Sequence, residues 1–176
     1  MSLRIAALGL LAAYPGSGYD LLKRFEQSMP NVWPATQSQL YGELNKLADG
    51  GLIEVSDIGP RGRKEYRVTP AGRAELVRWI TNPHDDPPVR RPGVLRVFLL
   101  GEVPADVARE YVTTFAERAA SDLKRYEHLR DSVPWQDDDG GDFYARAALE
   151  YGIQNAAMEE RWAHWLINAI DERTRE

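Results

Sequence analysis

The fold is decided by the stretch TQSQLYGELNKLADGGLIEVSDIGPRGRKEYR, residues Thr36–Arg67. Its first part predicts a helix over Thr36–Asp49, because leucines recur at helical spacing and the Gly50–Gly51 pair can end it. Thr36 and Gln39 have the spacing of a capping box, in which each side chain satisfies a backbone N–H of the other residue. We therefore expect a capped helix with one apolar and one polar face.

The second part of this stretch predicts a β-hairpin. Apolar and polar residues alternate over Leu52–Ser56 and again over Glu65–Val68, as they do in half-buried strands. The turn Gly59–Lys64 between them contains Gly62, which tolerates a positive φ. Its basic side chains are Arg61, Arg63 and Lys64. A helix followed by a hairpin with a basic tip is the plan of a winged helix-turn-helix, in which the helix enters the major groove of DNA and the tip lies on phosphates.

Candidate DNA contacts follow from this plan. Hydrogen-bonding side chains on the polar side of the helix are suited to base edges or the groove: Gln37, Ser38, Gln39 and Tyr41. The candidates for phosphates or the groove edge are Tyr19, Lys46, Arg61, Arg63 and Lys64. An ordinary amphipathic helix, or a solvated basic loop, is the simpler explanation of either piece alone. A capped polar helix followed directly by a basic hairpin tip favours DNA binding over either explanation.

Three runs together resemble the PadR family of transcriptional regulators: GYDLLKRFEQ at Gly18–Gln27, LYGELNKLADGGLIE at Leu40–Glu54 and GPRGRKEYRVTPAGRAEL at Gly59–Leu76. The resemblance implies a winged helix-turn-helix with a C-terminal helical dimerisation arm. Two departures stand out. Gly42 follows the recognition-helix tyrosine where the family often has proline, and Glu65 precedes Tyr66 where an aromatic or basic residue is frequent.

The remainder of the first half is predicted to be helical. Apolar spacing predicts a first helix over Leu3–Ala13, and Ser17 can cap a second that runs to about Met29. Pro30–Pro34 is then the turn between the two helices of the motif, with Trp33 in it as a plug beneath them. Thr69 can cap a further helix after the hairpin, with proline at its favoured first position.

The second half predicts long helices after a linker. Residues 82–93 hold four prolines and mixed charge, which separates a DNA-binding domain at 1–81 from a helical domain at 94–176. A short helix is expected over Val94–Leu100, then two long helices, from Pro104 to near Pro134 and after the acidic loop Asp137–Asp142. The last carries apolar residues that we expect at a dimer interface: Trp162, Trp165, Leu166 and Ile170. An intramolecular hairpin folded over the first domain is the alternative.

Charge is unevenly distributed along the chain. The net charge is −5 overall, but residues 1–80 hold ten basic and eight acidic side chains, a net of +2. The other residues hold 12 and 19, a net of −7. A local basic excess matters more for DNA binding than the global sign does.

Composition argues against several other classes of protein. The chain has no cysteine, so it has no disulfide or thiolate metal site, and its longest apolar run, Ile5–Ala13, is too short for a membrane span. We therefore expect a cytoplasmic protein without a membrane partner. His84, His128 and His164 stand alone, and no nucleophile elbow or phosphate loop is present. We expect no metal, no cofactor and no enzymatic activity.

These observations predict a mainly α fold with a small β-hairpin wing: a winged helix-turn-helix domain plus long C-terminal helices. The predicted function is a sequence-specific transcriptional repressor that binds double-stranded DNA as a homodimer on an inverted repeat. A small aromatic or hydrophobic effector could bind among Tyr111, Phe115, Trp162 and Trp165. Two alternatives remain: a small-molecule sensor module, and a helical interaction protein that uses the winged helix for protein contacts.

Overall fold

The chain divides into two compact units, Met1–Pro88 and Val89–Glu176. The computed structural model describes residues 2–28, 35–82, 88–135 and 141–175. The predicted turn at 30–34, with Trp33, lies outside these residues, as do His84 and most of the acidic loop. No helix within the described ranges is long and apolar enough to cross a membrane.

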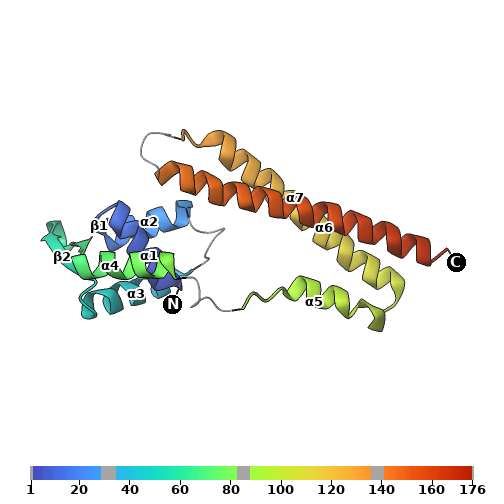
Figure 1. The fold of residues 1–176 in the computed structure, drawn as a ribbon, viewed down its shortest axis with the longest axis horizontal. Coiled ribbons are helices and arrows are strands. Elements are labelled where there is room, and N and C mark those ends of the chain that lie inside the picture. Colours follow the sequence, from blue (N-terminus) through green and yellow to red (C-terminus); the bar gives the residue numbers. More distant parts are fainter. Residues whose placement is uncertain (1, 29–34, 83–87, 136–140, 176) are drawn as a thin grey trace. The chain divides into compact units, whose positions relative to one another are not determined.

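Among its described residues, the first unit combines four α-helices with a small antiparallel sheet (Figure 1). The helices are α1 (Ser2–Ala13), α2 (Gly18–Ser28), α3 (Gln37–Asp49) and α4 (Pro70–Thr81). The strands are β1 (Gly16–Ser17), β2 (Ile53–Ile58) and β3 (Lys64–Val68), in the order β1-β3-β2. The predicted winged helix-turn-helix plan is therefore confirmed, and β1 is an addition that the sequence did not predict.

The core of this unit is made by the apolar faces of the first three helices. Leu40, Leu44 and Leu47 of α3 are at most 2% exposed. They pack against α1 and α2 in a cluster that also contains Leu8, Leu11, Leu21, Phe25 and Ile53. Burial of these side chains stabilises the unit by about 1.5–3 kcal/mol each and holds the opposite face of α3 toward solvent.

Both ends of α3 are closed by local hydrogen bonds. Thr36 Oγ1 accepts from the Gln39 backbone N–H at 3.3 Å, and Gln39 Oε1 accepts from the Thr36 N–H at 2.8 Å, which completes the predicted capping box. At the other end, Gly51 has a φ of 67°, and the Leu52 N–H donates to the Leu47 carbonyl at 2.9 Å. This arrangement is a Schellman motif, which stops the helix and turns the chain into β2.

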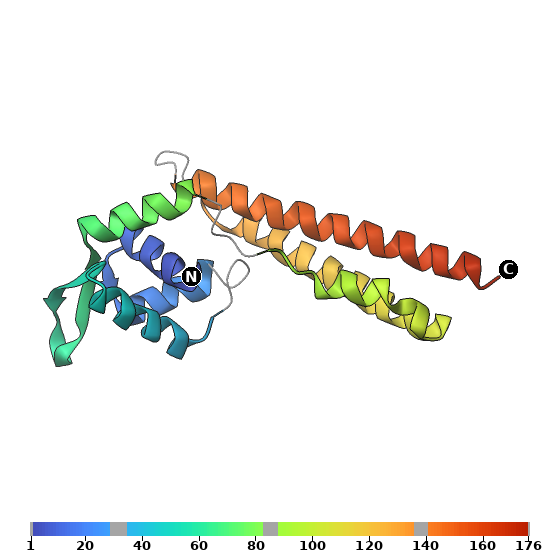
Figure 2. The same cartoon turned by 60° about the horizontal axis from the view of Figure 1, so that its bottom comes forward.

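The hairpin of β2 and β3 forms the wing. Ile53 pairs with Val68, and a bulge between Val55 and Asp57 shifts the register farther out. Gly62 in the tip has a φ of 76°, a positive value that glycine was predicted to accommodate at this position. Figure 2 shows the hairpin extending beyond the helices of its unit.

The start of α4 is tied to the end of α3. Thr69 Oγ1 accepts from the Gly72 N–H at 3.1 Å, which is the predicted cap, and donates to the Gly51 carbonyl at 2.8 Å. Gly72 lies so close to β2 that an added Cβ would be 2.1 Å from the Leu52 carbonyl oxygen. This close approach accounts for the glycine.

The second unit is a helical hairpin with a short helix before it. It contains α5 (Pro92–Phe98), a 3-10 turn η3 (Leu100–Glu102), α6 (Ala105–Ser132) and α7 (Gly141–Arg173). Helices α6 and α7 pack against each other; they cross in Figure 1 and run side by side in Figure 2. Arg109 near the start of α6 makes two hydrogen bonds with Asp171 near the end of α7, at 2.7 and 3.2 Å.

Small side chains dominate the contact between α6 and α7. The buried positions are Ala108, Val112, Ala116 and Ala119 on α6, and Ile153, Ala156 and Ala163 on α7. Aromatic side chains on α7 lie elsewhere: Tyr144, Tyr151 and Trp165 are 73%, 70% and 62% exposed. The apolar stripe predicted on α7 is therefore divided, because Trp162 and Ile170 pack toward α6.

The close approach at Gly72 generates a stability prediction. Gly72→Ala should lower the free energy of unfolding by about 1–3 kcal/mol, the usual cost of overpacking a fixed backbone contact. The matched control is Gly42→Ala on α3, where an added Cβ meets nothing within 4 Å. Because alanine is the better helix former, that variant should gain up to about 1 kcal/mol. Chemical denaturation measures the free energy of unfolding of both variants. Equal changes would contradict the close contact at Gly72.

Candidate nucleic-acid interface

The polar face of α3 is open to solvent at its N-terminal end. Gln37 and Ser38 are exposed, and they stand in the first turn, where the helix dipole is positive. Gln39 is also exposed, but its side chain closes the capping box on Thr36. Gln37 and Ser38 are thus the base-edge candidates that can face a ligand at the start of α3. Gln39 instead caps the helix.

Four predicted contacts gather around one depression of the surface, with a volume of about 270 Å³. Tyr19 comes from the first turn of α2, Tyr41 from α3, and Arg63 and Lys64 from the wing. Its other lining residues are Ser17, Gly18 and Tyr66. Tyr19, Tyr41 and the Arg63–Lys64 pair are far apart in sequence, so the fold brings together three sites that were predicted separately.

The floor of this depression depends on a glycine. A Cβ at Gly18 would lie 2.7 Å from the Tyr41 ring and 3.2 Å from Leu44. With glycine here, the ring can lie directly on the start of α2, and Tyr41 keeps 38% exposure. The tyrosine is thus both anchored and accessible.

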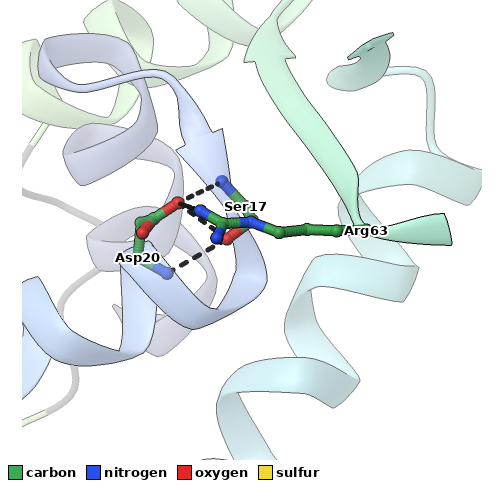
Figure 3. Close-up of polar contacts among 3 residues, drawn as sticks. All are labelled: Ser17, Asp20 and Arg63. Carbon is green, nitrogen blue, oxygen red and sulfur yellow. Dashed lines mark hydrogen bonds and ion pairs between the residues drawn. The ribbon is translucent and has the colours of Figure 1, made fainter. Parts of the chain in front are cut away.

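Arg63 is held by an acidic side chain at the edge of the depression. Its guanidinium donates to Asp20 Oδ2, and the same oxygen accepts from the Ser17 N–H at 3.0 Å and the Ser17 hydroxyl at 2.7 Å (Figure 3). The Ser17 hydroxyl also accepts from the Asp20 N–H at 3.3 Å. Figure 3 shows the guanidinium reaching from the wing to the turn that begins α2.

These contacts favour the ionised carboxylate. The hydrogen bonds from Ser17 lower the pKa of Asp20 below its ordinary value of 3.8, and the bond and charge of Arg63 lower it further, against an opposing effect of burial. Asp20 therefore carries its negative charge at neutral pH. The sequence predicted Ser17 only as a helix cap and did not predict the ion pair of Asp20, because its partner Arg63 is 43 residues away.

The remaining phosphate candidates lie outside this group. Lys46 stands in the last turn of α3, where its Nζ donates to Glu43 at 2.7 Å. Arg61 belongs to the short 3-10 turn Pro60–Gly62 at the wing tip, and its side chain is not among those that the structure describes. Arg67, on β3, was not among the candidates, and its Nε pairs with Glu54 across the wing at 2.7 Å.

Three of the four candidate effector residues form an aromatic group in the second unit. Tyr111, Phe115 and Trp162 pack around the buried residues Val112, Ala116 and Ala163. The Phe115 and Trp162 rings meet edge to face with centroids 5.6 Å apart. Trp165 is outside this cluster, on the exposed side of α7. Among the described side chains, no group of three or more His, Asp or Glu could hold a metal ion.

A helix with its polar face exposed, flanked by a wing with basic side chains, defines a winged helix-turn-helix protein. Two family models match the chain. Residues 7–78 match the transcriptional regulator PadR-like family, and residues 89–171 match the C-terminal region of the virulence activator alpha family. The first unit therefore resembles PadR-like transcriptional regulators, a family whose members are not enzymes.

Individual relatives match over nearly the whole chain. The probable transcriptional regulator Rv1176c of Mycobacterium tuberculosis is 29% identical, over 98% of this chain and 100% of its own. The negative transcriptional regulator PadR of Bacillus subtilis is 28% identical, over 96% and 97%. Its crystal structure with p-coumaric acid covers 97% of this chain and 99% of its own, with a TM-score of 0.85 and 25% identity. Its structure with operator DNA shares the fold at a TM-score of 0.80 and 24% identity over the same shares.

Proposed function

We propose that this regulator binds double-stranded DNA through α3 and the wing. The observation that carries the proposal is the convergence of Tyr19, Tyr41, Arg63 and Lys64 on one depression beside the exposed start of α3. Gln37, Ser38 and Tyr41 are assigned to base edges and the groove, and the wing to phosphates. The structure of the B. subtilis relative with operator DNA supports DNA as the partner.

The proposed working form is a homodimer on an inverted repeat. Along α7, Tyr144, Tyr151, Met158 and Trp165 follow each other every seven residues, and each is at least 41% exposed. A seven-residue apolar repeat suits a packed helix pair, and leaving such a stripe in water is costly. A second exposed apolar group lies on and just after α5: Val94, Leu95, Phe98 and Leu99. A two-fold dimer would present two readers to two half-sites.

The proposed output is repression in the cytoplasm, relieved by a small aromatic or hydrophobic effector. The negative regulator PadR of B. subtilis, and its structure with p-coumaric acid, support both parts. The aromatic group of Tyr111, Phe115 and Trp162 is the proposed contact for the effector, and Trp165, on the exposed side of α7, is the fourth candidate. These side chains offer ring faces and edges to a planar ligand.

The wing and the helix should respond differently to mutation. Lys64→Ala should weaken binding to every duplex alike and reduce the salt slope by about 0.9, since one phosphate contact is lost. Ser38→Ala and Tyr41→Ala should cost about 1–3 kcal/mol on a selected site and less on random DNA. Fluorescence anisotropy over a salt series measures both. Lys124→Ala, an exposed lysine of α6, is the control. Equal losses of affinity on the selected site and on random DNA would contradict a role of α3 in sequence specificity.

The exposed α7 stripe should hold the dimer. Replacing Tyr151 and Trp165 together by glutamate should raise the dimer dissociation constant at least about 100-fold, since each buried ring contributes about 1.5–3 kcal/mol. Truncation before Trp162 would be a poorer test, because Leu166 and Ile170 also pack within the subunit. Tyr14→Glu, an aromatic 50% exposed in the first unit, is the control. Sedimentation that finds a wild-type monomer at micromolar concentration would contradict the dimer.

Effector binding should perturb the aromatic group. With p-coumaric acid as the probe, the tryptophan emission of the full chain should change saturably, and Trp162→Phe should reduce the change. Trp135→Phe is the control, since the Trp135 ring N–H donates to the Arg130 carbonyl at 2.8 Å, away from this cluster. A change that persists in Trp162→Phe but disappears in Trp135→Phe would place the ligand elsewhere.

A further inference from the structure

The Asp20 carboxylate lies next to the surface proposed to bind DNA, where it pairs with Arg63. Asp20 follows Tyr19, and its pKa is lowered, so it is ionised at neutral pH. A negative charge close to DNA phosphates opposes binding by simple electrostatics. Its position next to Arg63 therefore suggests a task that offsets this repulsion.

We propose that Asp20 is a positioning residue for DNA binding, which holds Arg63 of the wing in place for a phosphate. The inference deepens the proposed function and rests on it. Asp20 does not itself touch DNA in this account. It sets the direction of the arginine that does.

The carboxylate is itself firmly anchored. It accepts two hydrogen bonds from Ser17, whose side chain is 2% exposed. The same serine belongs to β1 and pairs with Glu65 of β3, two residues after Arg63. The backbone ladder and the ion pair thus join the start of α2 to the base of the wing at two points. The Asp20 carboxylate, bound by Ser17 and by Arg63, therefore has little freedom to move away from the arginine.

Arg63 can bind Asp20 and a phosphate together. A guanidinium has five N–H donors in a rigid fork, so a carboxylate at one nitrogen leaves donors for a second anion. The Arg63 side chain is 47% exposed and lines the depression that Tyr19 and Tyr41 also line. Fixing a long side chain before it binds reduces the entropy lost on binding.

The test is the change in DNA affinity of the full-length chain when Asp20 loses its charge, because the two explanations predict opposite changes. The probe is a mixed-sequence duplex of about 30 base pairs, long enough for several phosphate contacts. If Asp20 positions Arg63, Asp20→Asn should weaken binding about 3- to 10-fold, the scale of immobilising one long side chain. Its salt slope should also fall toward that of Arg63→Gln. If the carboxylate only repels DNA, the same variant should bind as tightly as the wild type or more tightly, which would overturn the proposal.

A double variant separates positioning from damage to the fold. Asparagine keeps an oxygen that can accept from Ser17, so the cap of α2 can persist. In the Arg63→Gln background, Asp20→Asn should cause no further loss, because the residue it positions is gone. A further loss of the same size would show a general structural role and overturn the proposal. Asp20→Glu, which keeps the charge, should recover part of the affinity.

The outcomes also distinguish this inference from the proposed function. A wild-type chain that binds no duplex at low salt contradicts both. A wild-type chain that binds, and whose affinity falls in Lys64→Ala but not in Asp20→Asn, contradicts the positioning role alone.

Discussion

Burial of one face of α3 is the constraint on which the rest of the structure depends. Leu40, Leu44 and Leu47 can leave water only against α1 and α2, and this contact holds the opposite face outward. The Schellman turn at Gly51 then directs the chain into β2, and the wing returns beside the helix. The surface proposed to bind DNA is thus a consequence of core packing, since its polar residues lie on the face of α3 opposite the buried leucines.

Local signals account for most of the first unit. The capping box at Thr36, the Gly50–Gly51 stop, the alternation of the wing and Gly62 each act within a few residues, so their structures could be predicted from sequence. The two-residue strand β1 could not, because it exists only through pairing with β3. The Asp20–Arg63 pair escaped prediction for the same reason. Its partners meet only after the whole unit has folded.

The second unit was harder to predict in detail. Helical spacing located α6 and α7, and it put Trp162, Trp165, Leu166 and Ile170 on one face, which was expected at a dimer interface. Alanines fill much of the α6–α7 contact, because small side chains let two helices approach closely. Trp162, Leu166 and Ile170 pack there as well, and Trp165 is left outside. The periodicity of a sequence shows that a face is apolar, yet it does not say whether the partner is the same chain or a second copy. That choice rests on the exposure that the structure provides.

The central claim is that the α3–wing surface of a dimer reads a specific duplex. Selection of binding sites from random double-stranded DNA by the purified full-length chain tests it most directly. The account predicts enrichment of an inverted repeat whose half-sites lie one helical turn, about 34–36 Å, or a multiple of it, apart. It further predicts that enrichment disappears when Ser38 and Tyr41 are both alanine. Recovery of no common sequence by a folded wild-type chain would contradict the claim.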